Sequence, residues 1–109
     1  MTALGQHWPD PMSRFLGTDV ERFESEHGIH GQSWVLGRDL HLLTVVATDP
    51  GTGQLRRFLE ACKAEYESVS VWHIMNPVLA GILKRYGFKR AKKVEPDGEK
   101  LIGYTWTRS

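Results

Sequence analysis

Residues 76 to 88 specify the start, the buried face and the end of one helix; they read Asn76-Pro77-Val78-Leu79-Ala80-Gly81-Ile82-Leu83-Lys84-Arg85-Tyr86-Gly87-Phe88. Asn76 is a favourable N-cap, and Pro77 occupies the first helical position, where a missing N–H is tolerated. Gly87 can adopt the left-handed conformation that ends a helix. Between these ends the apolar side chains follow helical spacing, at Val78, Leu79, Ile82, Leu83 and Tyr86. A strand is expected immediately before the helix, over residues 68–75.

The succession of strand, Asn, helix and Gly-Phe resembles the last conserved block of the GNAT superfamily of acetyl-CoA-dependent N-acetyltransferases. In that family an Asn follows the fifth strand and Gly-Phe ends the next helix eleven and twelve residues later, which is the spacing of Gly87 and Phe88 from Asn76. The resemblance covers residues 34 to 109. It implies an α/β fold: a small GNAT-like mixed sheet of five to six strands, with two main helices and a shortened N-terminus.

This helix departs from the family at the position where catalysis would take place. Many members have, seven residues after the Asn, a Tyr that protonates the leaving CoA thiolate, and Leu83 stands at that position here. A leucine side chain has no proton to donate. Tyr86, three residues further along the helix, is the catalytic candidate that the resemblance leaves.

Two hairpins are expected, one before this block and one after it. A crossover helix should connect the first hairpin to the strand of residues 68–75. Residues 33–37 and 40–48 predict the first hairpin. A helix reaching Glu67 is indicated by the spacing of Leu55, Phe58, Leu59, Cys62 and Tyr66. Because this helix connects two strands, residues 40–48 and 68–75 should pair in parallel. Residues 88–94 and 101–107 should form the final antiparallel hairpin.

The N-terminal region is expected to contain little regular structure. Residues 1–13 show no periodic pattern, which predicts an irregular arm followed by a single domain over residues 14–109. Thr18-Asp19-Val20-Glu21 has the residues of a capping box, so a helix of about ten residues should begin there. Gly28 should end that helix.

The loop of residues 51 to 54 corresponds to the place where GNAT enzymes hold the CoA pyrophosphate. Gly51, Thr52, Gly53 and Gln54 precede a helix, whose free N–H groups and positive dipole end favour phosphate. Together with Asn76 they are the candidate cofactor-binding residues, for acetyl-CoA if the protein is active. An ordinary turn and N-cap is the competing interpretation, because no single register matches both the glycines and the apolar pair of the family. On that interpretation no cofactor is expected.

Two groups of residues are candidates for contacts with a partner. Trp8 and Phe15 would be unusual in water, so they should lie against a protein partner or a second copy of the chain, or else on this domain's own sheet. The other group is a basic cluster consisting of Lys84, Arg85, Lys89, Arg90, Lys92 and Lys93. Such a cluster is ordinarily a solvated face; otherwise it would meet CoA phosphates, an acidic protein or nucleic acid. Nucleic acid ranks last because the net charge is only +1.

Composition excludes several classes of protein. The 109 residues suffice for one domain, with 40% apolar and 25% charged residues. No apolar run in the sequence is long enough to cross a bilayer. Cys62 is the only cysteine, so an internal disulfide is excluded. His27 and His30 lack further ligands at metal spacing, so no metal site is predicted, and Cys62, His41 and His73 are expected to be structural.

Two functions follow from the resemblance. The favoured one is a catalytically degenerate GNAT-like domain that acts through protein–protein contacts, with a protein partner or as a homo-oligomer. A structural or assembly role in a tailed-phage virion is one form of this function, because residues 55–58, 76–87 and 97–98 are similar to stretches of the small internal virion protein of podoviruses. The alternative is an active acetyl-CoA-dependent N-acetyltransferase. The expected location is the cytoplasm, or the virion for a phage protein.

Overall fold

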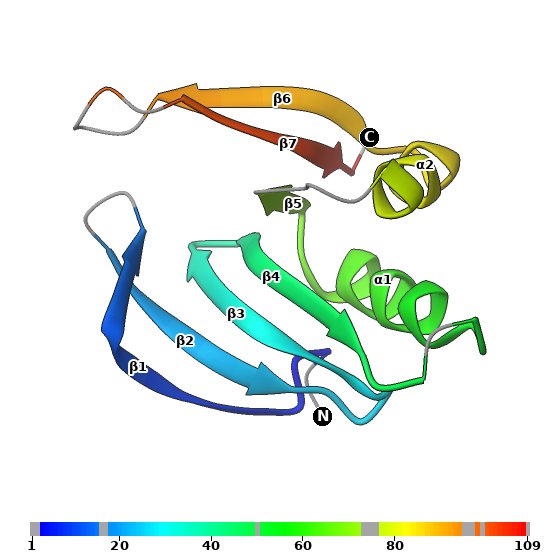
Figure 1. The fold of residues 1–109 in the computed structure, drawn as a ribbon, viewed down its shortest axis with the longest axis horizontal. Helices are drawn as coiled ribbons and strands as arrows, with labels where there is room; N and C mark the ends of the chain where they lie inside the picture. The colour runs from blue at the N-terminus through cyan, green and yellow to red at the C-terminus, as the bar shows by residue number, and fades with distance from the viewer. Residues whose placement is uncertain are drawn as a thin grey trace.

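A computed structural model describes residues 3–15, 18–49, 51–72, 77–94, 98 and 100–108. Seven strands form one sheet in the order β1-β2-β3-β4-β5-β7-β6. The strands are β1 (Gln6–Phe15), β2 (Thr18–Glu24), β3 (Ile29–Leu36), β4 (Asp39–Ala47), β5 (Ser68–Trp72), β6 (Lys89–Val94) and β7 (Lys100–Thr107). The helices are α1 (Gln54–Glu65) and α2 (Pro77–Arg85). Figure 1 shows both helices on the same side of the curved sheet.

The expected GNAT-like α/β fold of five to six strands with a shortened N-terminus is wrong, because the structure is a mainly-sheet fold of seven strands. The additional strands come from the N-terminal region. β1 pairs antiparallel with β2, and β2 pairs antiparallel with β3. The predicted irregular arm of residues 1–13 therefore lies largely within β1, and the predicted helix beginning at Thr18 is the strand β2.

The failure at β2 has a specific physical reason. Val20 and Phe23 are three residues apart, so on a helix they would share one face. In the sheet they are buried on opposite faces, in two separate apolar clusters, and each is only 1% exposed. Burial on both faces stabilises the strand, and it outweighs the local preference of a capping box for a helix start.

β1 is an edge strand, which explains why its prolines are compatible with a sheet. Pro9 lies opposite Glu21 in the β1–β2 pair, and Pro11 follows within the same strand. Proline cannot donate a hydrogen bond, and it is tolerated on edge strands because one side of such a strand has no partner in the sheet. Just before β1, Ala3 and Leu4 are buried in the main core. The N-terminal region therefore packs on this domain's own sheet.

The predicted order of elements after residue 28 is confirmed. β3 and β4 form an antiparallel hairpin, and so do β6 and β7. β4 and β5 are the parallel pair, and α1 connects them. The helix that anchored the sequence prediction is α2, although Asn76 at its expected N-cap lies outside the described residues.

The C-terminus of α2 has the predicted glycine ending. Gly87 has a φ of 89°, in the left-handed region. Its N–H donates to the Lys84 carbonyl at 3.2 Å, and the Phe88 N–H donates to the Leu83 carbonyl at 3.0 Å. These two bonds define a Schellman motif. Leu83 and Phe88 are both buried, so the motif also fixes an apolar contact between the helix end and the core.

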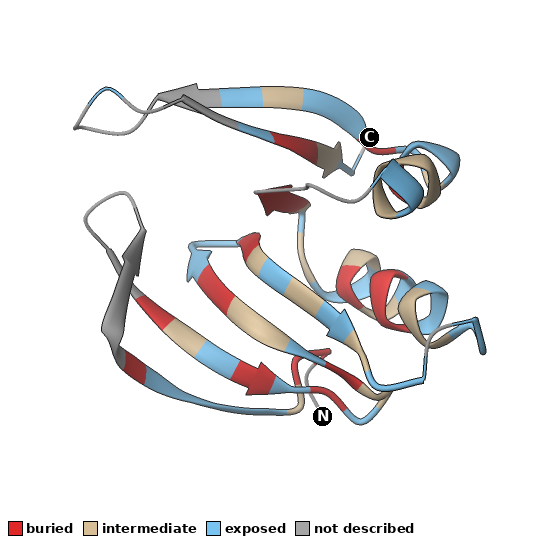
Figure 2. Cartoon of the chain, viewed as in Figure 1, coloured by how far each residue is buried: buried red, intermediate tan, exposed pale blue. Residues whose placement is uncertain are grey.

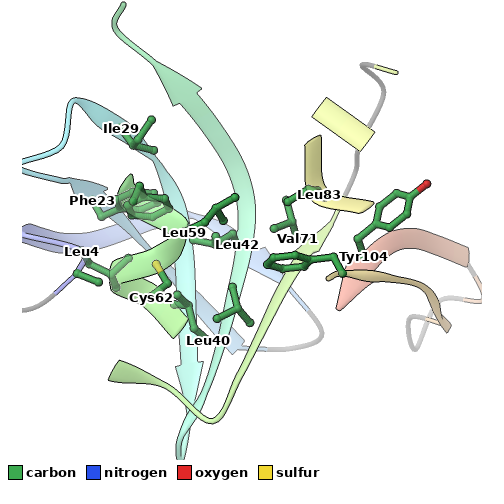
Figure 3. Close-up of a cluster of buried hydrophobic side chains, with 14 residues drawn as sticks. Leu4, Phe23, Ile29, Leu40, Leu42, Leu59, Cys62, Val71, Leu83 and Tyr104 are labelled. Atoms are coloured by element: carbon green, nitrogen blue, oxygen red, sulfur yellow. The ribbon is translucent and has the colours of Figure 1, made fainter. Parts of the chain in front are cut away.

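The main core lies between the sheet and the two helices. Figure 2 shows buried residues on α1 and along the strands, and Figure 3 shows side chains of the main core. Its largest fully buried members include Phe23, Phe58, Leu42 and Leu83. A second, smaller cluster consists of Val20, Trp34 and Trp72, with Leu43 and Ala91 packed against it. All five of these residues belong to strands.

Cys62 is expected to be chemically inert while the protein is folded. It is buried in the main core, and burial together with the nearby Glu65 carboxylate raises the pKa of its thiol to about 12. Because the thiolate is the reactive form, we expect no reaction with a disulfide reagent at pH 8 in buffer, and complete reaction in denaturant. The absorbance of the thiol that the reagent releases measures the extent of reaction in buffer and in denaturant. Fast labelling of the folded protein would contradict the burial of Cys62.

Candidate functional site

A pocket of about 420 Å³ lies between the N-terminus of α1 and the C-terminal half of α2. It brings Gly51, Gly53 and Gln54 together with Tyr86, so four of the six catalytic and cofactor-binding candidates share one site. The described residues that line it are Ala47, Asp49, Gly51, Gly53, Gln54, Leu55, Arg56, Ile82, Arg85 and Tyr86. The other two cofactor candidates are not placed there: Thr52 lies outside the lining, and Asn76 lies outside the described residues.

The loop that enters α1 leaves the helix N-terminus without a side-chain cap. Gly51 and Gly53 have φ values of 89° and 82°, which favour glycine at both positions. Gly53 is the N-cap residue; it makes no side-chain capping bond, and the first turn of α1 contains no acidic residue. The Thr52 hydroxyl instead donates to the Asp49 carbonyl at 2.7 Å. The positive end of the helix dipole therefore faces the pocket region without a negative side chain from its own first turn.

The side chain of Gln54 holds this loop in place. Its amide oxygen accepts a hydrogen bond from the Asp49 N–H at 2.8 Å, and its amide nitrogen donates to the Thr48 hydroxyl at 3.2 Å. A Cβ atom at Gly28 would lie 2.1 Å from that amide nitrogen, so glycine there makes room for the arrangement. Gln54 thus ties the start of α1 to the end of β4, which is a structural role.

Two arginines give the pocket a positive character that the sequence did not reveal. Arg56 comes from the first turn of α1 and Arg85 from the last turn of α2. Among the lining residues that the structure describes, Asp49 is the only one with a carboxylate and none is a histidine. No sequence signal could have paired the two arginines, because only the packing of α2 beside the loop brings them to one site.

Tyr86 is held by a lysine at the junction of both helices and β7. The Lys63 ammonium donates a hydrogen bond to the Tyr86 carbonyl oxygen. It also lies 5.5 Å from the ring centroid of Phe88 and 5.4 Å from that of Trp106, within the range of cation–π attraction. These contacts fix the end of α2 against α1 and so fix where Tyr86 enters the pocket wall.

In the described residues, β4 and β5 pair in parallel from Asp39 to Leu42 on β4 and from Ser68 to Val71 on β5, and residues 73–76, which follow β5, lie outside the described part of the chain. β4 continues to Ala47, and over residues 44–47 its described strand partner is β3 alone. Ala47, the last residue of β4, lines the pocket.

The sheet face opposite the helices carries an open hollow of about 530 Å³. Successive residues of a strand point to opposite faces, so Arg22 and Glu24 lie on the face opposite the buried Phe23. The hollow is lined by Trp8, Arg22, Phe23, Glu24, His30, Gly31, Gln32, Thr44 and Val46. Trp8 is 43% exposed and Val46 is 48% exposed.

A buried aspartate fixes the polar part of the hollow. Asp10 is only 7% exposed, and its Oδ2 accepts hydrogen bonds from Arg22 Nε and Gln32 Nε2, both at 3.1 Å. Charge-assisted bonds of this kind hold both donors in fixed positions. The hollow therefore combines rigid polar groups with exposed Trp8 and Val46.

His41 has a structural role on the same face, as the sequence predicted. Its ring stacks on Trp34 at a centroid distance of 4.3 Å, and its Nδ1 accepts a hydrogen bond from Trp72 Nε1 at 3.1 Å. The imidazole is buried, and acceptance at Nδ1 requires that nitrogen to be unprotonated. The other predicted structural histidine, His73, lies outside the described residues.

The remaining interaction candidates lie mainly on β6. Lys89, Arg90 and Lys92 are exposed, whereas the side chains of Phe15 and Lys93 lie outside the described part of the chain. Among the described residues, no group of three or more metal-binding side chains occurs and no helix has the length and apolar character needed to span a membrane. Comparison of the chain with protein-family models, curated proteins and solved structures gives no match.

Proposed function

We propose that this chain acts through protein–protein contacts and has no catalytic activity. The observation that carries the proposal is the sheet face opposite the helices, where Trp8 and Val46 are exposed beside the polar groups of the hollow. In GNAT enzymes an N-terminal strand and two helices build part of the acceptor pocket. Here β1 is followed directly by β2, so in the described residues no helix covers this face.

The composition of this face suits a protein partner. An exposed tryptophan beside a β-branched side chain, surrounded by arginine, glutamate and histidine, has the apolar centre and polar rim typical of interfaces. Tryptophan and arginine are also enriched among residues that contribute most to binding. Since Arg22 and Gln32 are held by Asp10, a partner would meet groups that are already ordered, which lowers the entropy lost on binding.

Catalysis is disfavoured by the groups that the pocket lacks. Leu83, at the position of the family's thiolate-protonating Tyr, is fully buried in the core. Asp49 is the only described lining residue with a carboxylate that could accept a proton from an amine, and it is exposed to solvent.

Site-specific photo-crosslinking tests the proposal in cells that produce the protein. A photoreactive residue at Val46 should give one discrete crosslinked product, whereas the same residue at Glu60, on the outer side of α1, should give none. Mass spectrometry of the product distinguishes a second copy from another protein, and a virion protein would indicate the assembly role. With the purified partner, Trp8→Ala should weaken binding by about tenfold or more. Equal crosslinking from both positions would contradict the proposal.

An acetyl-CoA-dependent N-acetyltransferase is the second candidate, favoured by the pocket that unites Gly51, Gly53 and Tyr86 with two arginines.

Calorimetric titration with acetyl-CoA separates the two candidates. For a non-catalytic domain we expect no micromolar binding. Micromolar affinity that falls when Arg85 is changed to Glu, with Arg38→Glu as the matched control, would favour the enzyme. In that case Tyr86→Phe should retain binding and slow acetyl transfer, because it removes only the phenolic proton donor.

A further inference from the structure

The unit formed by α2, β6 and β7 carries charge of one sign over its described residues. Residues 77–94 and 100–108 contain lysine and arginine but neither aspartate nor glutamate. The acidic residues of this part of the sequence, Glu95, Asp97 and Glu99, all fall between the last residue of β6 and the first of β7. The exposed lysines and arginines therefore have no acidic neighbour within β6, β7 or α2.

These charges are displayed along an edge of the sheet and on both of its faces. β6 is the terminal strand of the sheet, and among the described residues its strand partner is β7 alone. Arg90 and Lys92 lie opposite Tyr104 and Ile102, so they share the helix-side face with these residues. Lys89 lies opposite Thr105 on the other face. Lys84 of α2 adds to the helix side, with its ammonium 5.8 Å from the centroid of the Tyr104 ring.

The two edges of the sheet are protected in different ways. On β1, Pro9 and Pro11 remove backbone donors, which blocks pairing with a strand of any charge. β6 contains no proline, so its outward N–H and C=O groups can pair with a further strand. Its lysines and arginine repel basic strands and other copies of β6, but they attract acidic ones. The β6 edge therefore excludes basic strands by charge repulsion but can still pair with acidic strands.

We propose that the β6 edge binds an acidic polypeptide segment of a partner protein in an extended conformation, which adds an eighth strand to the sheet. The backbone of the segment pairs with β6, and its carboxylates meet Arg90 and Lys92 on one face and Lys89 on the other. This mode is β-strand addition with charge selection. This site is separate from the hollow lined by Trp8 and Val46, so the proposal goes beyond the proposed function. An experiment can refute one of the two proposals without affecting the other.

An acidic polypeptide fits this surface better than the other candidates. Nucleic acid would use the positive charge but not the open backbone groups of the edge strand. A second copy of this chain offers two sheet edges: one is β6 itself, which is repelled, and the other is β1, which contains two prolines. The acidic strand is the one ligand that uses both the charge and the hydrogen-bonding groups of β6.

Fluorescence anisotropy with two peptides tests the proposal. The first is a labelled peptide of alternating Glu and Thr, and the second has the same charge but carries Pro in place of every second Thr. We expect saturable binding of the first peptide and binding of the second that is weaker by about tenfold or more. Arg90→Glu combined with Lys92→Glu should weaken binding of the first peptide by a similar factor. Arg56→Glu combined with Arg57→Glu changes the net charge equally, on α1, and should leave the affinity unchanged.

Hydrogen exchange supplies a readout that does not depend on the variants. Amides of β6 that point away from β7 should exchange rapidly in the free protein and slowly in the complex. Equal affinity for both peptides would overturn the proposal, because binding would then be electrostatic alone. Tighter binding of a single-stranded oligonucleotide than of the Glu-Thr peptide would overturn it in favour of a nucleic-acid surface. Unchanged exchange in β6 at saturating peptide would also overturn it.

Discussion

Gly103→Ala is expected to destabilise the protein by about 3 kcal/mol or more, because the sheet leaves no space for a side chain at this position. Gly103 lies in β7, between Trp72 of β5 and Ala91 of β6. A Cβ atom here would lie 2.2 Å from the Val71 carbonyl oxygen and 2.7 Å from a ring carbon of Trp72. Backbone of a central strand cannot move away at low cost, so the sheet itself would have to shift. Urea unfolding followed by tryptophan fluorescence measures the loss.

Gly81→Ala is the matched control for this prediction. Gly81 lies within α2, and nothing lies within 4 Å of a Cβ atom built there. Alanine is favoured over glycine inside a helix, so this variant should be more stable than the parent by about 0.5 to 1 kcal/mol. The same chemical change thus has opposite signs at the two sites. If Gly103→Ala cost less than about 1 kcal/mol, the close approach of β5 and β7 would be wrong.

Phe58→Ala is expected to cost about 3 to 5 kcal/mol, through lost burial and the cavity left behind. Phe58 is fully buried on the inner face of α1, and its ring stacks on Phe23 with centroids 5.5 Å apart. This contact joins α1 to β2, so it links the helix to the strand that the sequence did not predict. The free energy of unfolding from urea titration measures the effect, and the heat-capacity change gives an independent check.

Val78→Ala is the control for Phe58→Ala. It shortens an apolar side chain at an exposed position and should change the free energy of unfolding by less than about 0.5 kcal/mol. Val78 is 68% exposed on α2. A large loss at Val78 would mean that this face of α2 is covered in solution. A small loss at Phe58 would mean that α1 does not pack on β2, and the assignment of the main core would fail.

The sequence was sufficient for the end of α2, for the β4–β5 pair and for the final hairpin. Gly87 and Phe88 end α2 through hydrogen bonds to carbonyls only three and five residues earlier, so the residues that decide the ending are neighbours in the chain. The parallel pairing of β4 with β5 followed from the helix between them, since a crossover leaves little choice of direction. The two strands of the final hairpin are also close together in the sequence, so their pairing depends on neighbouring residues.

The candidate site was predicted in part. The glycine loop and Tyr86 were named separately from their sequence patterns, and the structure places both at one pocket. Arg56 was missed because its importance depends on α2 lying opposite it. Tyr86 owes its position to Lys63, which reaches across from α1, and that contact too joins residues far apart in the chain.

The sequence by itself determined the elements whose stability is decided within a few residues, namely α1, α2 and the hairpins after residue 28. Only the tertiary structure decided that residues 6–15 and 18–24 form strands. Val20 and Phe23 carry no local sign that one will be buried against Trp34 and Trp72 and the other against Phe58. Whether a side chain is buried depends on the residues that cover it, and here those residues follow later in the chain. β2 therefore forms a strand because the rest of the structure covers Val20 on one face of the sheet and Phe23 on the other.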